Sequence, residues 1–266
     1  MKTIKYLKLF LITLSIIVFT VGCGKNKLSL TVSGSTAFQP FAEKLADQYM
    51  QIHPDTRVTI QGGGSAVGIQ STLSGAAQIG MADLVDLPAE AKALSSVVVA
   101  RDGITLIVNL KNKVSNLTTR QIRDIYNGKI KNWKSVGGND HPITVISREA
   151  GSGTRSSFEA IIKDVSLTNN AIIQDSNGTV RETVCNDVNT LGYISHGLIN
   201  EKIKAISVNG IEGTAEEIIK GKYLLVRPIF FLTKEPPKDK IKEFIDYILS
   251  KQGQDTIKQN GLIPAK

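Results

Sequence analysis

Short apolar segments alternate with segments of helical periodicity along this chain, and that alternation restricts its fold more than any other feature. Strand candidates lie at residues 28–32, 58–60 and 79–81, and a helix candidate follows each of the first two. Strands that are separated by helices of this length form mostly parallel sheets with helices on both faces. The sequence therefore predicts an α/β fold.

Two β-branched segments, 96–100 and 104–109, end this first block. The turn-forming run Arg101-Asp102-Gly103 separates them, so we expect two strands with a turn between them. A capped helix start at Thr118 then opens a second block, in which strand and helix candidates alternate again. This second block predicts a second lobe.

A long apolar segment, residues 223–232, follows the second block and is well placed to return the chain to the first lobe. The expected first lobe is therefore discontinuous, 28–108 plus 227–266, with the second lobe, 109–226, inserted into it. Two covalent crossings between the lobes make a hinge.

The N-terminus has the pattern of a secretory leader. Three lysines precede an apolar run at residues 9–21, which is too short to span a bilayer comfortably as a helix. We predict that residues 1–22 are a lipoprotein signal peptide and that Cys23 receives the lipid, because small residues precede it as in a bacterial lipobox. Thr20 departs from that pattern, and the alternative is an ordinary cleavage site beside an unmodified cysteine.

Positive charge narrows the classes of ligand. The formal net charge is +8, and removal of the three leader lysines leaves about +5 (8 − 3). Such a charge suits an anionic ligand, a membrane surface or a nucleic acid. Nucleic acid is disfavoured because the lysines are scattered, aromatic residues are only 6% and a secretion signal precedes the domain.

Three turns rich in small residues lie where predicted strands end and helices begin, at residues 33–37, 62–66 and 148–154. Amide groups at helix N-termini favour an anion, and glycine lets a ligand approach the backbone. One such turn alone is better explained as an ordinary cap. Three turns together with Arg148, whose guanidinium can bind an oxyanion with two hydrogen bonds, predict an anion site.

Nucleotide binding is a weaker interpretation of the same glycines. Gly62 and Gly64, with Asp83 about 20 residues further on, resemble a dinucleotide fingerprint, but the third glycine is displaced to Gly68. The chain also has no Gly-Lys-Ser/Thr run of the Walker type.

Several short motifs match one known family. They are Gly34-Ser35-Thr36, Gly62 to Ser65, Ile79-Gly80-Met81-Ala82-Asp83, Gly151-Ser152-Gly153-Thr154-Arg155 and, in support, Gly192-Tyr193-Ile194-Ser195. Over essentially its whole mature length the chain resembles the PstS-type phosphate-binding proteins that serve ABC importers. The resemblance implies a two-lobed periplasmic-binding-protein-like fold of type II, with the ligand cleft between the lobes. It also implies a monomer without cofactor or metal. The protein would be lipid-anchored at the extracytoplasmic face of the cell membrane and would deliver phosphate to permease subunits.

The resemblance also implies a set of site residues. They are Ser35, Thr36, Ala37, Ser65 and Asp83 from the first lobe, and Arg148, Ser152, Gly153 and Thr154 from the second. Ala37 replaces a phenylalanine of some members, a change that its backbone amide tolerates. Ala150 stands where some members have an acid that orients the arginine, so Glu149 either takes that role or is solvated.

Asp83 is the residue that could distinguish phosphate from sulfate. A carboxylate repels an anion unless the ligand has a proton to donate, and phosphate keeps one near neutral pH whereas sulfate does not. The alternative is that Asp83 only caps a helix.

Other functions remain open from the sequence. The site could take another oxyanion such as sulfate or molybdate, or a small carboxylate, and the fold could serve as a surface adhesin with an inactive cleft. A secreted phosphatase needs a metal or an activated nucleophile, and His53, His141 and His196 have no metal-ligand spacing. We therefore predict a binding protein and not an enzyme.

Overall fold

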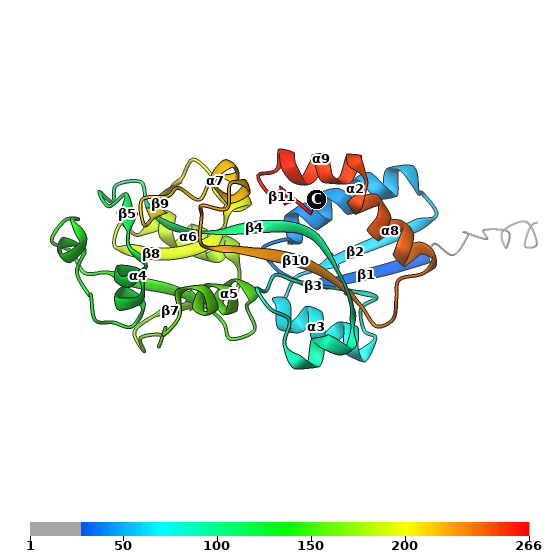
Figure 1. The fold of residues 1–266 in the computed structure, drawn as a ribbon, viewed down its shortest axis with the longest axis horizontal. Helices are drawn as coiled ribbons and strands as arrows, with labels where there is room; N and C mark the ends of the chain where they lie inside the picture. The colour runs from blue at the N-terminus through cyan, green and yellow to red at the C-terminus, as the bar shows by residue number, and fades with distance from the viewer. Residues whose placement is uncertain (1–27, 266) are drawn as a thin grey trace, which may run out of the picture.

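The computed structural model describes residues 28–265, so the predicted signal peptide and Cys23 lie outside the described residues. This part of the chain forms two lobes that lie side by side and are connected by long strands (Figure 1). Within residues 28–265, no helix has both the length and the apolar character needed to cross a membrane.

The first lobe is a sheet covered by helices on both faces. Figure 1 shows α2, α8 and α9 on one face and α3 on the other. Its strands are β1 (Leu28–Gly34), β2 (Thr56–Gln61) and β3 (Ile79–Ala82), and its helices are α2 (Gln39–Ile52), α3 (Ser65–Ser74), η2 (Ala89–Ala93), α8 (Asp239–Leu249) and α9 (Lys251–Gln259). The predicted apolar spacing is confirmed in α2, which buries Phe41, Leu45 and Tyr49.

The second lobe repeats this arrangement. Thr118 caps α4 and forms a capping box with Gln121, as its sequence predicts. The strands are β5 (Asn116–Leu117), β6 (Thr144–Arg148), β7 (Ile172–Gln174), β8 (Thr190–Ser195) and β9 (Ile203–Val208), and the helices are α4 (Thr119–Tyr126), η3 (Trp133–Val136), α5 (Gly153–Ile162), α6 (Asn177–Asn186), η4 (His196–Leu198) and α7 (Ala215–Ile219).

Two long strands, β4 (Ser95–Asn109) and β10 (Val226–Thr233), connect the lobes. The main strand order is β2-β1-β3-β10-β4-β8-β6-β7, and the short β11 (Ile263–Pro264) pairs with β4. β1 pairs in parallel with β2 and β3, and β6 pairs in parallel with β7 and β8. The antiparallel ladders between named strands all involve β4 or β10. A single sheet therefore runs through both lobes.

The predicted turn at Arg101-Asp102-Gly103 is wrong, because β4 runs through it without a break. Residues up to Gly103 pair with β10, and residues from Ile104 pair with β8. Asp102 resembles a turn residue in the sequence, but its carboxylate is buried in an ion pair with Arg227. A buried charge is stable inside a sheet when it has such a partner.

The apolar side chains form a separate core in each lobe. Phe38, Phe231 and Phe244 belong to the core of the first lobe, and Tyr126 and Phe158 belong to that of the second. The predicted division into 28–108 plus 227–266 and 109–226 stays a prediction. The packing of Ile104, Leu106 and Val108 in the second core favours moving its first boundary back to about Gly103.

Candidate anion-binding site

The predicted turns meet where the two lobes face each other. Ala66, in the first turn of α3, donates its amide to the carbonyl of Gly151, which precedes α5, at 3.1 Å. A cleft of about 230 Å³ opens beside this contact and is lined from both lobes, by Ser65 and Ala66 on one side and by Ala150 and Gly151 on the other. Turns that are far apart in the sequence therefore lie next to each other between the lobes.

Ser35 and Thr36 lie between β1 and α2 and have different hydrogen-bond partners. The Ser35 hydroxyl oxygen accepts from the amide of Phe38 at 3.1 Å, so it supports the turn before the helix. The Thr36 hydroxyl oxygen faces the second lobe, where it accepts from Arg148 Nη2 and from Asn177 Nδ2, each at 3.3 Å. Ala37 is buried beside them.

Arg148 ends β6 and is 1% exposed. Its Nε donates to Glu149 Oε2 and its Nη2 donates to Glu149 Oε1, both at 2.9 Å. The carbonyls of Gln174 and Asp175 accept from the same two nitrogens at 3.1 Å. Of the two alternatives left open by the sequence, the structure therefore selects the one in which Glu149 orients Arg148.

The third guanidinium nitrogen of Arg148 differs from the other two. Nη1 is buried and has no hydrogen-bond partner among residues 28–265. A buried charged donor without an acceptor is costly, so this nitrogen is suited to donate a hydrogen bond to an oxygen of an external anion.

Asp83 follows β3 and is 2% exposed. Its Oδ1 accepts from the Ser65 hydroxyl at 2.6 Å, and its amide donates back to the Ser65 oxygen at 3.0 Å. Its Oδ2 accepts from the Thr154 hydroxyl of the second lobe at 3.3 Å. The alternative prediction that Asp83 only caps a helix is wrong, because its carboxylate bridges the lobes.

Arg227 was not predicted as part of this site. It is fully buried in β10, where its Nη1 forms an ion pair with Asp83 Oδ2 and its Nη2 lies 2.9 Å from Asp102 Oδ2. Burial raises the pKa of the Asp102 carboxyl above its usual range, against the opposing effect of the Arg227 guanidinium. The one available signal was an arginine within an otherwise apolar strand segment.

Helix α5 supplies the remaining predicted residues. Ser152 caps it by accepting from the amide of Arg155 at 3.2 Å, and Gly153 and Thr154 are its first two residues. Amides in the first turn of a helix have no partner within the helix and can donate elsewhere. A Cβ on Gly153 would lie 2.5 Å from Asp83 Oδ1 and closer still to the Ser65 hydroxyl, so glycine permits the close approach of the lobes.

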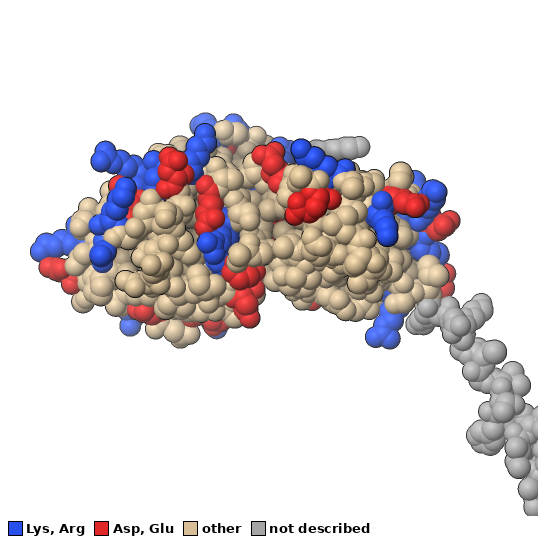
Figure 2. Space-filling view, turned by 90° about the horizontal axis from the view of Figure 1, so that it is seen from below, with Lys and Arg blue, Asp and Glu red and all other residues tan. Residues whose placement is uncertain are grey.

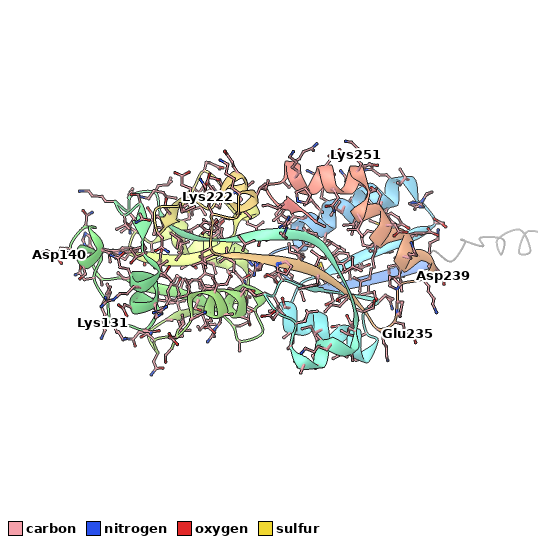
Figure 3. All side chains as sticks on the ribbon, in the orientation of Figure 1. Lys131, Asp140, Lys222, Glu235, Asp239 and Lys251 are labelled. Atoms are coloured by element: carbon pink, nitrogen blue, oxygen red, sulfur yellow. The ribbon has the colours of Figure 1, made fainter. Side chains whose placement is uncertain are left out.

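The outer surface is unlike this site. On the face that Figure 2 shows, basic and acidic side chains are interspersed. The charged residues labelled in Figure 3, among them Asp140 and Lys251, lie at the periphery, whereas Arg148, Asp83 and Arg227 are buried. The site therefore concentrates charge in the interior between the lobes.

Two lobes that close around buried polar groups define a solute-binding protein. The model of the PBP superfamily domain matches residues 22–252. Similarity to curated proteins includes the phosphate-binding protein PstS of Bacillus subtilis, at 34% identity over 89% of this chain and 80% of that protein. The phosphate-binding protein PstS of Borreliella burgdorferi is 30% identical over 91% of both chains. The chain belongs to the PstS family of phosphate-binding proteins.

Solved structures agree with this family assignment. One from Clostridium perfringens, described as a phosphate ABC transporter substrate-binding protein with bound phosphate, has a TM-score of 0.87 and 42% identity, covering 90% of this chain and 100% of that one. An ABC-type phosphate transport receptor from Vibrio cholerae has a TM-score of 0.74 and 36% identity, covering 89% and 99%. Their similarity confirms the predicted two-lobed α/β fold.

The close approach at Gly153 gives a first testable prediction. In Gly153→Ala the added methyl group collides with Ser65 and Asp83, so the lobes are held further apart. With a saturating oxyanion, small-angle X-ray scattering should give a larger radius of gyration than for the wild type. Gly178→Ala in α6 is the matched control, because its Cβ would meet only the Ser176 hydroxyl at 3.7 Å. Equal compactness of Gly153→Ala and the wild type would contradict the prediction.

Proposed function

We propose that this protein captures inorganic phosphate between its lobes and delivers it to an ABC importer. The observation that carries the proposal is Arg148 Nη1, a buried cationic donor without a partner among the described residues. It lies in a site that also holds a buried carboxylate, Asp83, in a chain related to phosphate-binding proteins. A strong donor together with an acceptor suits an anion that both accepts and donates hydrogen bonds.

The proposed ligand contacts come from both lobes. Donors would be the groups at the N-terminal ends of α2, α3 and α5, whose helix dipoles favour negative charge, together with the guanidinium of Arg148. Asp83 would accept a hydrogen bond from the protonated oxygen of the phosphate. The proposed phosphate-binding residues are Ser35, Thr36, Ala37, Ser65, Asp83, Arg148, Ser152, Gly153 and Thr154.

Closure of the lobes is the proposed signal to the importer. Thr36 accepts from Arg148, and Asp83 accepts from Thr154, so the residues that would touch phosphate also join the lobes. A ligand that contacts both lobes stabilises the closed form by its stronger binding to that form. The protein is a binding protein and not an enzyme, as its relatives are binding proteins in transport.

The cellular placement follows from the N-terminus. Residues 1–22 would direct export, and a lipid on Cys23 would hold the monomeric protein at the extracytoplasmic face of the cell membrane, beside the permease subunits. That placement keeps the captured ion close to the importer.

Isothermal titration tests the proposed ligand. The chain without residues 1–22 should bind phosphate with measurable heat and at a ratio of one ion per chain. Sulfate and molybdate should give no comparable heat at the same concentration. Binding of sulfate or molybdate without phosphate binding would overturn the proposal.

Asp83→Asn tests the origin of selectivity. The amide can donate to an anion that has no proton, and the repulsion from the carboxylate is gone, so sulfate binding should appear. Phosphate affinity should fall by about 10- to 100-fold, the effect of losing one hydrogen bond to a charged group. Titrations with both anions measure the ratio, and an unchanged exclusion of sulfate would contradict the role given to Asp83.

Glu149→Ala tests how Arg148 is held. Two acceptors of the guanidinium are lost, its orientation relaxes, and phosphate affinity should fall by about tenfold. Glu182→Ala is the matched control, because Glu182 also follows an arginine and lies 3.6 Å from Arg181. Similar affinities for both variants would show that Glu149 does not orient Arg148 for binding.

A further inference from the structure

Three buried charges join the anion site to the strands that connect the lobes. Arg227 in β10 lies between Asp83, which follows β3, and Asp102 in β4, and none of the three is more than 2% exposed. β10 pairs with β3 on one side and with β4 on the other, as Figure 1 shows. We call these three residues the charge cluster.

Within the described chain, every guanidinium nitrogen of Arg227 has a protein acceptor. Nη1 pairs with Asp83 Oδ2 and donates to the Asp83 carbonyl at 3.3 Å. Nη2 and Nε donate to Asp102 Oδ2 at 2.9 and 3.3 Å. Arg227 is therefore unlike Arg148, whose Nη1 has no acceptor among residues 28–265. The Arg227 guanidinium therefore binds the two aspartates and is not the group that would bind an incoming anion.

The charge cluster also fixes which parts of the Asp83 carboxylate are engaged. Arg227 and Thr154 share Oδ2, whereas Ser65 donates to Oδ1. Each carboxylate oxygen can accept more than one hydrogen bond, so capacity remains for a ligand proton. Residues of both lobes therefore fix the orientation of the Asp83 carboxylate.

A buried carboxylate stays ionised only when a charge partner or hydrogen bonds offset its loss of hydration. If the Asp83 carboxylate were free to turn away from the ligand, it would neither accept from a phosphate that bears a proton nor repel an anion that has none. Discrimination between phosphate and sulfate then depends on the group that keeps Asp83 an acceptor. Arg227 is the cation in ion-pair contact with it.

We infer that Arg227 is a specificity-determining positioning residue, which holds the Asp83 carboxylate oriented as an acceptor, so that the site favours an anion able to donate a hydrogen bond. The inference rests on the proposed function, because it deepens the selectivity of the same site. Arg227 acts through Asp83 and makes no contact with the ligand.

The test compares Arg227→Gln with Asp102→Asn by isothermal titration with phosphate and with sulfate at neutral pH. Both variants break the buried charge cluster, so both lose stability. In Asp102→Asn the pair of Arg227 with Asp83 remains, and the ratio of sulfate Kd to phosphate Kd should stay near that of the wild type. In Arg227→Gln the ratio should fall by about 10- to 100-fold.

A double variant keeps the test decisive if Arg227→Gln does not fold. Arg227→Gln with Asp102→Asn removes one positive and one negative charge, so the net charge of the cluster equals that of the wild type. Asp83 still loses its cationic partner, and the ratio should fall as in the single variant. A ratio that is unchanged in the folded variants lacking Arg227 would overturn the inference.

Phosphate binding by the wild-type chain distinguishes failure of this inference from failure of the proposed function. Absence of phosphate binding by the wild-type chain would overturn the proposed function, and the inference with it. Wild-type binding of phosphate, with the same ratio after removal of Arg227, would overturn the inference alone.

Discussion

The ion pair between Arg227 and Asp102 is the interaction on which the rest of the structure depends. These residues are direct register partners on β10 and β4, the two strands that connect the lobes. A buried arginine and a buried aspartate are tolerated only when they meet, since an unpaired buried charge costs several kcal/mol. A slip of one residue would also turn every side chain to the opposite face. The pair therefore fixes the register of the crossing, and with it the relation between the lobes.

The two buried arginines of the site have different partners and different roles. Arg148 is oriented by Glu149 and two carbonyls, which leaves Nη1 without an acceptor among residues 28–265. Arg227 has its nitrogens engaged by Asp83 and Asp102. The first arginine therefore keeps a donor for the proposed anion, and the second is paired with the acid to which we assign selectivity. Preorganisation of this kind lowers the cost of ordering the site on binding.

Much of the fold and part of the site follow from local patterns. Apolar periodicity predicts the helix with Phe41, Leu45 and Tyr49, and cap chemistry predicts the helix start at Thr118. Glycine-rich turns at strand ends predict an anion site with Arg148. What the patterns misassign is Asp102, because a polar residue beside glycine has the same local signature in a turn as in a buried ion pair.

The sequence by itself determined the α/β class and the turns that carry helix N-termini, and its resemblance to a known family predicted a set of phosphate-site residues. Only the tertiary structure decided that Glu149 orients Arg148, that β4 is continuous, and that Arg227 holds Asp83. The physical reason is separation along the chain. Arg227 is 125 residues from Asp102 and 144 from Asp83, so no local propensity or period can encode their contact. It exists only once the crossing strands have paired.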